Sequence, residues 1–178
     1  MAYGLTARRG GAYNRLAEPA WAEPLDVGFA RERGGRWNGP GSFGVLYLNR
    51  SVALARAQAR HKLAGQPYGV EDLDESEQHD LVEVDVPDGD YLDCVTGAGL
   101  EAVGLPAGYP SHPDGRAVEH AECRPVAEAA RDDGRPGVAC RSAAAGAPAG
   151  DEELAVFDTA VGGVVMTGRS AFADWYYA

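Results

Sequence analysis

The chain has 178 residues, 45% hydrophobic and 24% charged, which suits one globular domain with its own core and leaves too little for two. Its 16 Lys and Arg residues stand against 27 Asp and Glu residues, so a formal net charge of -11 opposes nonspecific binding to nucleic acid or to an anionic membrane, although a local basic pocket is compatible with it. No apolar run approaches the roughly 20 residues of a membrane helix, and the first residues lack a signal-peptide core, so the chain is predicted to be cytoplasmic.

The first third of the chain carries strand and helix signals in alternation. A short strand is predicted to begin near Ala12 and to end at the prolines after Ala17, and residues 26–35 are predicted to be a polar connection. The apolar segment 43–49 favours a strand. Ser51 can then cap a helix over residues 52–64, which Gly65 and Pro67 are expected to stop.

The middle of the chain is predicted to hold an acidic loop and two strands. Residues 69–80, with the acidic loop proper at 71–80, read as a mobile loop or a partner surface. Alternating apolar and acidic residues at 81–86 indicate a half-exposed strand, and residues 88–95 look like a second strand after a Pro-Asp-Gly turn. A loop rich in proline and glycine follows at 104–116.

The last third is predicted to contain one helix, two strands and a docked tail. Residues 117–134 read as a helix in which Pro125 marks a point of breakage. Strands are expected at 137–143 and 154–160, with a low-complexity linker over 143–153, and the aromatic tail 170–178 is expected to pack against the protein. Short strands mixed with few helices indicate an α+β fold in a single domain spanning 1–178.

Cysteine and histidine do not point to a metal site. The three cysteines are far apart, form no C-x-x-C pair and have no histidine at zinc-ligand spacing, so they are predicted to be buried free thiols. The four histidines are equally scattered. No metal is expected.

One polar residue stands out on the helix after Ser51. At about 100° per residue, Gln58 lies opposite Arg56 and Arg60, so it faces inward if those arginines face water. A buried amide without a partner costs about 1–3 kcal/mol. Gln58 therefore either satisfies a neighbouring backbone group or belongs to a polar site, and the helix alone leaves both open.

The order of several motifs resembles the RES domain family. The motifs are "AYNR", then "GGRWNGPG" running into "VLYL", then a serine opening an alanine-rich helix, and later "GVACRSA" followed by "LAVFD". The resemblance covers about 13–158. The family is named for an arginine, a glutamate and a serine, and its characterised members are toxins of toxin–antitoxin pairs.

The resemblance implies a fold similar to ADP-ribosyltransferase toxins, with two small mixed or antiparallel sheets and a few helices around a dinucleotide cleft. It implies NAD as the substrate, cleaved between nicotinamide and ribose, and a helix-turn-helix antitoxin as partner. A homodimer is left open, and neither nucleic acid nor membrane is expected to be bound directly. In residues, it implies NAD binding by Arg15, Arg36, Tyr47 and Ser142, and catalysis by Tyr47, Ser142 and residue 58, where Gln58 replaces the family's glutamate.

Physical chemistry supports these roles and also offers structural alternatives. An arginine fork suits a pyrophosphate, and a glycine turn lets backbone and guanidinium approach it closely. Equally, Arg36 could pair with a carboxylate, Tyr47 could be a core aromatic, and Ser142 could satisfy a backbone group at a strand end.

The substitution at residue 58 bears on catalysis. Breaking the nicotinamide–ribose bond passes through an oxocarbenium-like state that a carboxylate stabilises, and Gln58 brings no charge. Losing one such electrostatic partner costs about 10²–10³ in rate, so Gln58→Glu is expected to raise cleavage about 10²-fold. The acidic loop offers substitute carboxylates, which sequence cannot place: Glu71, Asp72, Asp74 and Glu75.

Three functions follow as hypotheses: an active NAD-consuming toxin, a catalytically weakened RES domain that binds NAD or a related nucleotide, and a non-catalytic partner-binding domain. Water, phosphate or a protein could each accept the ADP-ribosyl group. The first two hypotheses predict that Arg15, Arg36, Tyr47, Gln58 and Ser142 converge on one pocket, and that this pocket is locally positive. The third predicts no nucleotide binding.

Overall fold

The computed structural model describes residues 2–178. The strands in this range are β1 (Thr6–Ala17), β2 (Val45–Asn49), β3 (Asp80–Cys94), β4 (Gly137–Arg141), β5 (Glu152–Phe157) and β6 (Val165–Ser170). The helices are α1 (Gly28–Arg33), α2 (Val52–His61), α3 (Gly97–Ala102), α4 (His120–Asp132) and α5 (Phe172–Tyr176), with 3-10 turns η1 (Val70–Asp72) and η2 (Val161–Gly163). The predicted α+β class is confirmed. No helix of residues 2–178 has the length and apolar character needed to cross a membrane.

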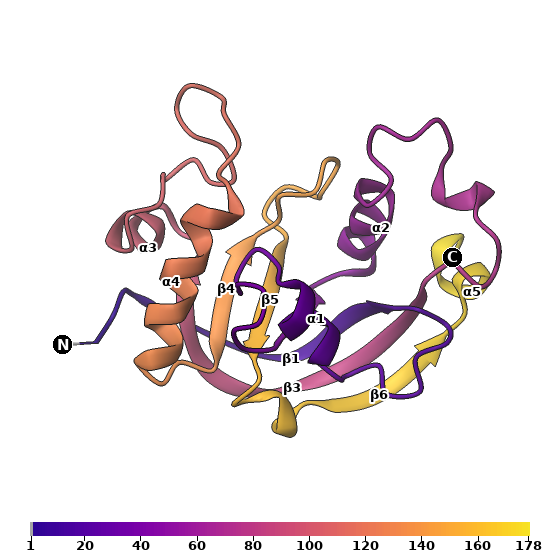
Figure 1. Cartoon of the computed structure of the whole chain (residues 1–178), viewed down its shortest axis with the longest axis horizontal. Coiled ribbons are helices and arrows are strands. Elements are labelled where there is room, and N and C mark those ends of the chain that lie inside the picture. The colour runs from indigo at the N-terminus through magenta and orange to yellow at the C-terminus, as the bar shows by residue number, and fades with distance from the viewer. Residues whose placement is uncertain (1) are drawn as a thin grey trace.

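Two long antiparallel strands, β1 and β3, form the base of the sheet (Figure 1). Their pairing runs from Thr6 opposite Leu92 to Ala17 opposite Asp80. The two separate strands predicted at 81–86 and 88–95 are therefore one strand of 15 residues, and the turn predicted between them is wrong.

A β-bulge explains the difference. Arg9 pairs with Gly89 and Gly11 with Val86, so the register shifts and two residues of β3 face one of β1. The shift falls at Pro87, whose missing N–H cannot join the ladder. Gly10 accommodates it, because a Cβ at this position would collide with the backbone of Asp88. The Pro-Asp-Gly sequence thus bends a strand here and does not reverse it.

The strands join into one six-stranded sheet, which corrects the expected pair of small sheets. β3 pairs with β6 near its start and with β4 near its end, and β5 lies between β4 and β2. A single pairing, Asn14 with Asn49, links β1 to β2 and closes the arrangement. The long strands β1 and β3 cause the fusion, since both extend across what would be two separate sheets.

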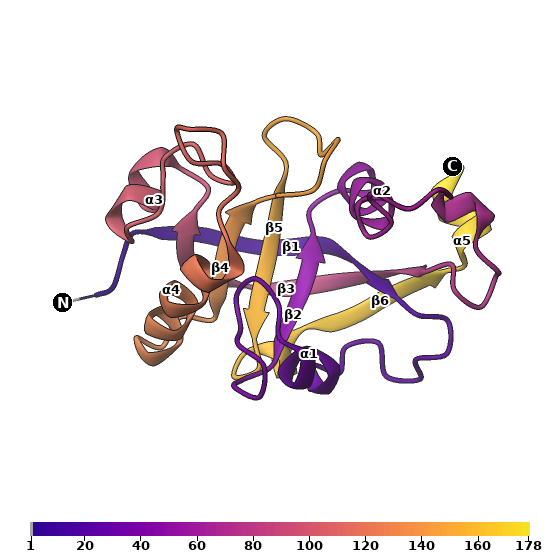
Figure 2. The ribbon, with the colours of Figure 1, turned by 45° about the horizontal axis from the view of Figure 1, so that its top comes forward.

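Four helices lie in two groups on either side of β2, β4 and β5, α3 with α4 and α2 with α5, while α1 lies at the lower end of β2 in Figure 2. α3 and α4 pack on one apolar cluster with Trp37 and Phe157, while α2 and α5 share another around Phe172 and Trp175. The predicted docking of the aromatic tail is confirmed. So is the burial of the three cysteines.

Several local predictions need correction. Residues 26–35 contain the short helix α1 in place of a purely polar connection. Pro125 lies inside α4 without breaking it, because the missing bond is to the carbonyl of Ala121 in an exposed first turn. The predicted linker 143–153 is shorter, since β5 begins at Glu152.

Candidate functional site

A cavity of about 480 Å³ opens between the turn before β2, the helix α2 and the strands β1, β2 and β5. Its volume lies within the range of small-molecule sites. Four of the five candidate residues, Arg15, Arg36, Tyr47 and Gln58, line it, although they are far apart in the sequence. Ser142 does not line it, but its hydroxyl lies 3.3 Å from the Gln58 amide nitrogen. The full lining is Arg15, Leu16, Trp21, Phe29, Ala30, Gly34, Gly35, Arg36, Val45, Tyr47, Leu48, Asn49, Gln58, His61, Lys62, His120, Ala143, Ala144 and Glu153.

Arg15 is a buried cation at one side of this cavity. It lies on the inward-facing positions of β1, between Tyr13 and Ala17, and is only 8% exposed. Its guanidinium lies over the ring of Trp21 and makes one long contact, 3.5 Å, to the carbonyl of Asp26. Among residues 2–178 no carboxylate forms an ion pair with it, and its Nε and Nη1 atoms have no hydrogen-bond partner. Burial lowers the pKa of Arg15 to about 10.

Arg36 lines another side of the cavity, directly after the turn of Gly34 and Gly35. Its Nη1 donates to the carbonyl of Val118 (2.9 Å), and its guanidinium lies 5.9 Å from the ring centre of Tyr109. Within the described chain it forms no ion pair, so the alternative that it serves a carboxylate is not what the structure shows. The turn requires glycine at position 35, where a Cβ would collide with the hydroxyl of Tyr47.

Tyr47 lines the cavity, and its hydroxyl is engaged by the turn that carries Arg36. The hydroxyl donates to Asn38 Oδ1 (2.7 Å) and accepts from the backbone N–H of Trp37 (3.0 Å). Burial raises the pKa of Tyr47. The phenol therefore holds the turn that carries Arg36, and the predicted catalytic role of Tyr47 stays a prediction.

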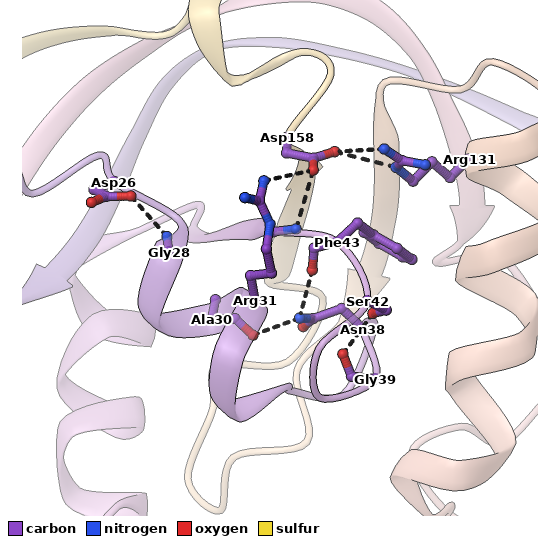
Figure 3. Close-up of polar contacts among 11 residues, drawn as sticks. Asp26, Gly28, Ala30, Arg31, Asn38, Gly39, Ser42, Phe43, Arg131 and Asp158 are labelled. Carbon is purple, nitrogen blue, oxygen red and sulfur yellow. Dashed lines mark hydrogen bonds and ion pairs between the residues drawn. The ribbon is translucent and has the colours of Figure 1, made fainter.

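Asn38 ties the same turn to α1, as Figure 3 shows. Its amide donates to the carbonyls of Ala30 (2.7 Å) and Phe43 (3.0 Å). Above it in Figure 3, Asp158 pairs with Arg31 and Arg131, each at 3.1 Å, which anchors this end of β5 to α1 and α4. Rigid support of this kind keeps a binding residue in place.

The far wall of the cavity holds Gln58 together with Glu153. Ser51 caps α2, accepting from the Leu54 N–H at 3.0 Å, and the helix aims Gln58 at the start of β5. The Gln58 amide donates to Glu153 Oε1 as well as contacting Ser142. The inward orientation expected for Gln58 is confirmed, and its partners are side chains.

Glu153 was missed by sequence reasoning, which assigned it to the linker. Extending β5 backwards with its period of two would have placed it on the face of Ala155 and Phe157, beside the cavity. The acidic loop does not substitute: Glu71 accepts from the Tyr176 hydroxyl, Asp72 caps the Gly69 N–H, and none of residues 71–80 lines the cavity.

The lining is positive on balance, as predicted. Three cations, Arg15, Arg36 and Lys62, face it with Glu153 as the one carboxylate contributed by residues 2–178. Burial, helped by the charge of Arg36, lowers the pKa of His120 at the α4 end, which favours its neutral form. Nowhere in the described chain do three or more Asp, Glu, His or Cys side chains gather closely enough to hold a metal ion.

A second basic hollow is a weaker candidate because its cations are already engaged. It has a volume of about 410 Å³ and is lined by Arg8, Arg9 and Arg50. Arg9 pairs with Glu152, Arg8 pairs with Asp90, and Arg50 donates to backbone carbonyls.

One comparison with known proteins shows a family, and a second shows a similar fold. The RES domain family model matches residues 8–174. The fold is similar to a chain in the crystal structure of the M. tuberculosis MbcT-MbcA toxin-antitoxin complex, with a TM-score of 0.76, 23% identity, and coverage of 97% of this chain and 92% of that chain. No curated protein matches by sequence.

Proposed function

The chain belongs to the RES domain family, and from that premise we propose that it is the toxin of a toxin–antitoxin pair and consumes NAD by cleaving the nicotinamide–ribose bond. The observation that carries this proposal is Arg15, a buried cation without a carboxylate partner among residues 2–178, at the wall of a positive cavity. A buried charge is costly unless something pairs with it. An anionic ligand supplies the missing partner.

A dinucleotide suits the arrangement because its charge and its reactive bond lie at different places. Arg15 and Arg36 are available for the pyrophosphate, since neither is taken by a carboxylate of the described chain. Gln58 and Glu153 provide an amide and a carboxylate for the ribose hydroxyls and the anomeric carbon. Aromatic rings of Trp21, Phe29 and Tyr47 offer surfaces on which flat rings can stack.

The proposal includes an antitoxin. The similar fold was solved as a toxin–antitoxin complex, which supports a partner protein of the same kind for this chain. We propose a helix-turn-helix protein encoded beside it, whose binding closes access to the cavity. Co-purification of that neighbour with this chain, and loss of NAD cleavage in the complex, would test the pairing.

The enzymatic part is tested with purified protein and NAD, by quantifying free nicotinamide over time and NAD binding by calorimetry. Arg36→Ala should abolish binding and turnover, because it removes a phosphate-binding cation. Arg116→Ala, at an exposed loop arginine outside the cavity, is the matched control and should behave like the parent. Binding without nicotinamide release would favour the weakened RES domain, and neither binding nor release would favour the partner-binding domain.

A further inference from the structure

We propose that Glu153 is the catalytic carboxylate of this cavity and that Gln58 is its positioning residue, so that the negative charge absent from position 58 is supplied from β5. The inference rests on the NAD-cleaving function proposed above. The glutamine on α2 then does not mean that the site lacks a carboxylate, because the charge stands on the adjacent Glu153, on the same wall of the cavity.

The reaction defines what the carboxylate must do. The bond between ribose C1′ and the nicotinamide nitrogen breaks with both electrons going to nitrogen, so nicotinamide leaves neutral. Positive charge then develops on C1′ and the ring oxygen. Water forms the new C1′–O bond with a lone pair and releases its proton to solvent. A negative group beside C1′ stabilises the state in between, which is the largest single contribution expected from one residue.

Glu153 is the carboxylate best placed for this role. It is the single one that residues 2–178 contribute to the cavity lining. It sits on the central strand β5, paired with Asn49 of β2 on one side and Cys140 of β4 on the other, so its backbone is fixed by two neighbours. A catalytic group on a rigid strand is held more accurately than one on a loop.

Gln58 suits Glu153 better than a glutamate would. Its amide N–H donates to the carboxylate, which fixes the orientation of the carboxylate and favours its ionised form. A glutamate at position 58 would bring two carboxylates into contact, and such a pair shares one proton instead of carrying two charges. The 10²-fold gain expected from sequence for Gln58→Glu is therefore replaced by the expectation of no gain.

The environment of Glu153 sets the pH at which it works. Burial raises its pKa, while the Ser142 hydroxyl, the charge of Arg36 and the Gln58 amide lower it part of the way back. Cleavage should rise with pH as Glu153 loses its proton. A raised folded-state pKa also means that the ionised residue destabilises the fold near neutral pH, so an amide at 153 should not impair folding.

The test compares nicotinamide release and NAD affinity in phosphate-free buffer across a set of exchanges. Glu153→Gln should lower release about 10²–10³-fold while NAD still binds. Gln58→Glu should give no increase. The double exchange Gln58→Glu with Glu153→Gln returns one carboxylate and one amide to the pair, and should recover at least about tenfold over Glu153→Gln alone, which excludes misfolding as the cause of the loss.

Two further variants complete the design. Glu152→Gln makes the same chemical change one residue away, on the opposite face of β5 where Glu152 pairs with Arg9, and is the control expected to keep the parent's rate. Gln58→Met removes the donor at similar size, and should move the acid limb of the pH–rate profile to higher pH because the hydrogen bond that favours ionised Glu153 is gone.

The outcomes separate the two proposals. If the parent releases nicotinamide and Glu153→Gln releases it as fast, the role of Glu153 is overturned and NAD cleavage stands. The same follows if Gln58→Glu raises the rate of release about 10²-fold. A parent that releases no nicotinamide in phosphate-free buffer and none after phosphate is added overturns both. An unshifted pH profile in Gln58→Met overturns the positioning role of Gln58.

Discussion

Replacing Arg15 by methionine should make the protein more stable and a poorer binder of NAD. The pKa of this buried guanidinium falls from 12.5 to about 10 on burial, which corresponds to about 3 kcal/mol at about 1.36 kcal/mol per tenfold change in proton affinity. Methionine fills similar space without a charge. The substitution also removes the contact between the guanidinium and the Trp21 ring, 5.6 Å apart, and this loss lowers stability by about 1–2 kcal/mol.

The net expectation is a stabilisation of about 1–2 kcal/mol, or about 2–8 °C in Tm for a chain of this size. NAD affinity should fall about 10–100-fold, because a hydrogen bond to a charged partner contributes about 1.5–3 kcal/mol. Urea denaturation measures the first change and calorimetry with NAD the second. Arg8→Met is the matched control: Arg8 forms exposed ion pairs with Asp88 and Asp90, whose loss should change stability by less than about 1 kcal/mol and leave NAD binding intact.

The prediction for Arg15→Met requires two changes of opposite sign, a rise in stability and a fall in NAD affinity. A purely structural Arg15 would give a less stable variant with unchanged NAD affinity, and that result would refute both the energetic argument and the phosphate role. A variant destabilised by more than about 1 kcal/mol would show that the Trp21 contact outweighs the cost of the buried charge.

Three other predictions follow from the same structure. NAD affinity should weaken as salt is raised, since arginine–phosphate attraction is screened, and an affinity insensitive to salt in calorimetry would contradict that anchoring. Burial and the neighbouring Lys62 lower the pKa of His79 from 6.5 to about 4, so the unfolded state binds the proton more tightly than the folded state does. The free energy of unfolding should therefore drop by up to about 3 kcal/mol as the pH falls from about 6.5 to about 4. His79→Gln should flatten this slope in urea titrations, and a slope unchanged by the substitution would place its origin elsewhere. Asn38→Ala leaves the Tyr47 hydroxyl and the Phe43 carbonyl without their partner, so it should lower stability by about 2–4 kcal/mol in thermal unfolding and weaken NAD binding. A loss of stability below about 0.5 kcal/mol would mean that water replaces the amide.

Local signals explain the elements that sequence predicted well. The strand β2, the helix α2 with its Ser51 cap, and the strand β4 are all defined by short runs whose apolar pattern or capping residue lies within the element itself. Helical geometry predicted the inward face of Gln58 on the condition that Arg56 and Arg60 face water; the orientation is confirmed, although Arg56 donates to the carbonyls of the C-terminal tail.

Where the outcome depended on a distant segment, sequence was insufficient. Pro87 with its neighbours is compatible with a turn or with a bulge, and the long pairing with β1 decides for the bulge. The same pairing fuses the two expected sheets into one. α1 lacks a side-chain cap and has no buried residue, so no local sequence pattern predicts this helix.

The sequence by itself determined the family, the α+β class and the identity of the arginines, because those depend on residue order and local pattern. Only the tertiary structure decided which carboxylate meets Gln58. Glu153 stands 95 positions away in an acidic run that reads as linker, and strand pairing with Asn49 and Cys140 brings it to the cavity. The tertiary structure also decided that Arg15 has no carboxylate partner within residues 2–178, since a charge finds or lacks its partner through contacts across the sheet, which no local pattern records.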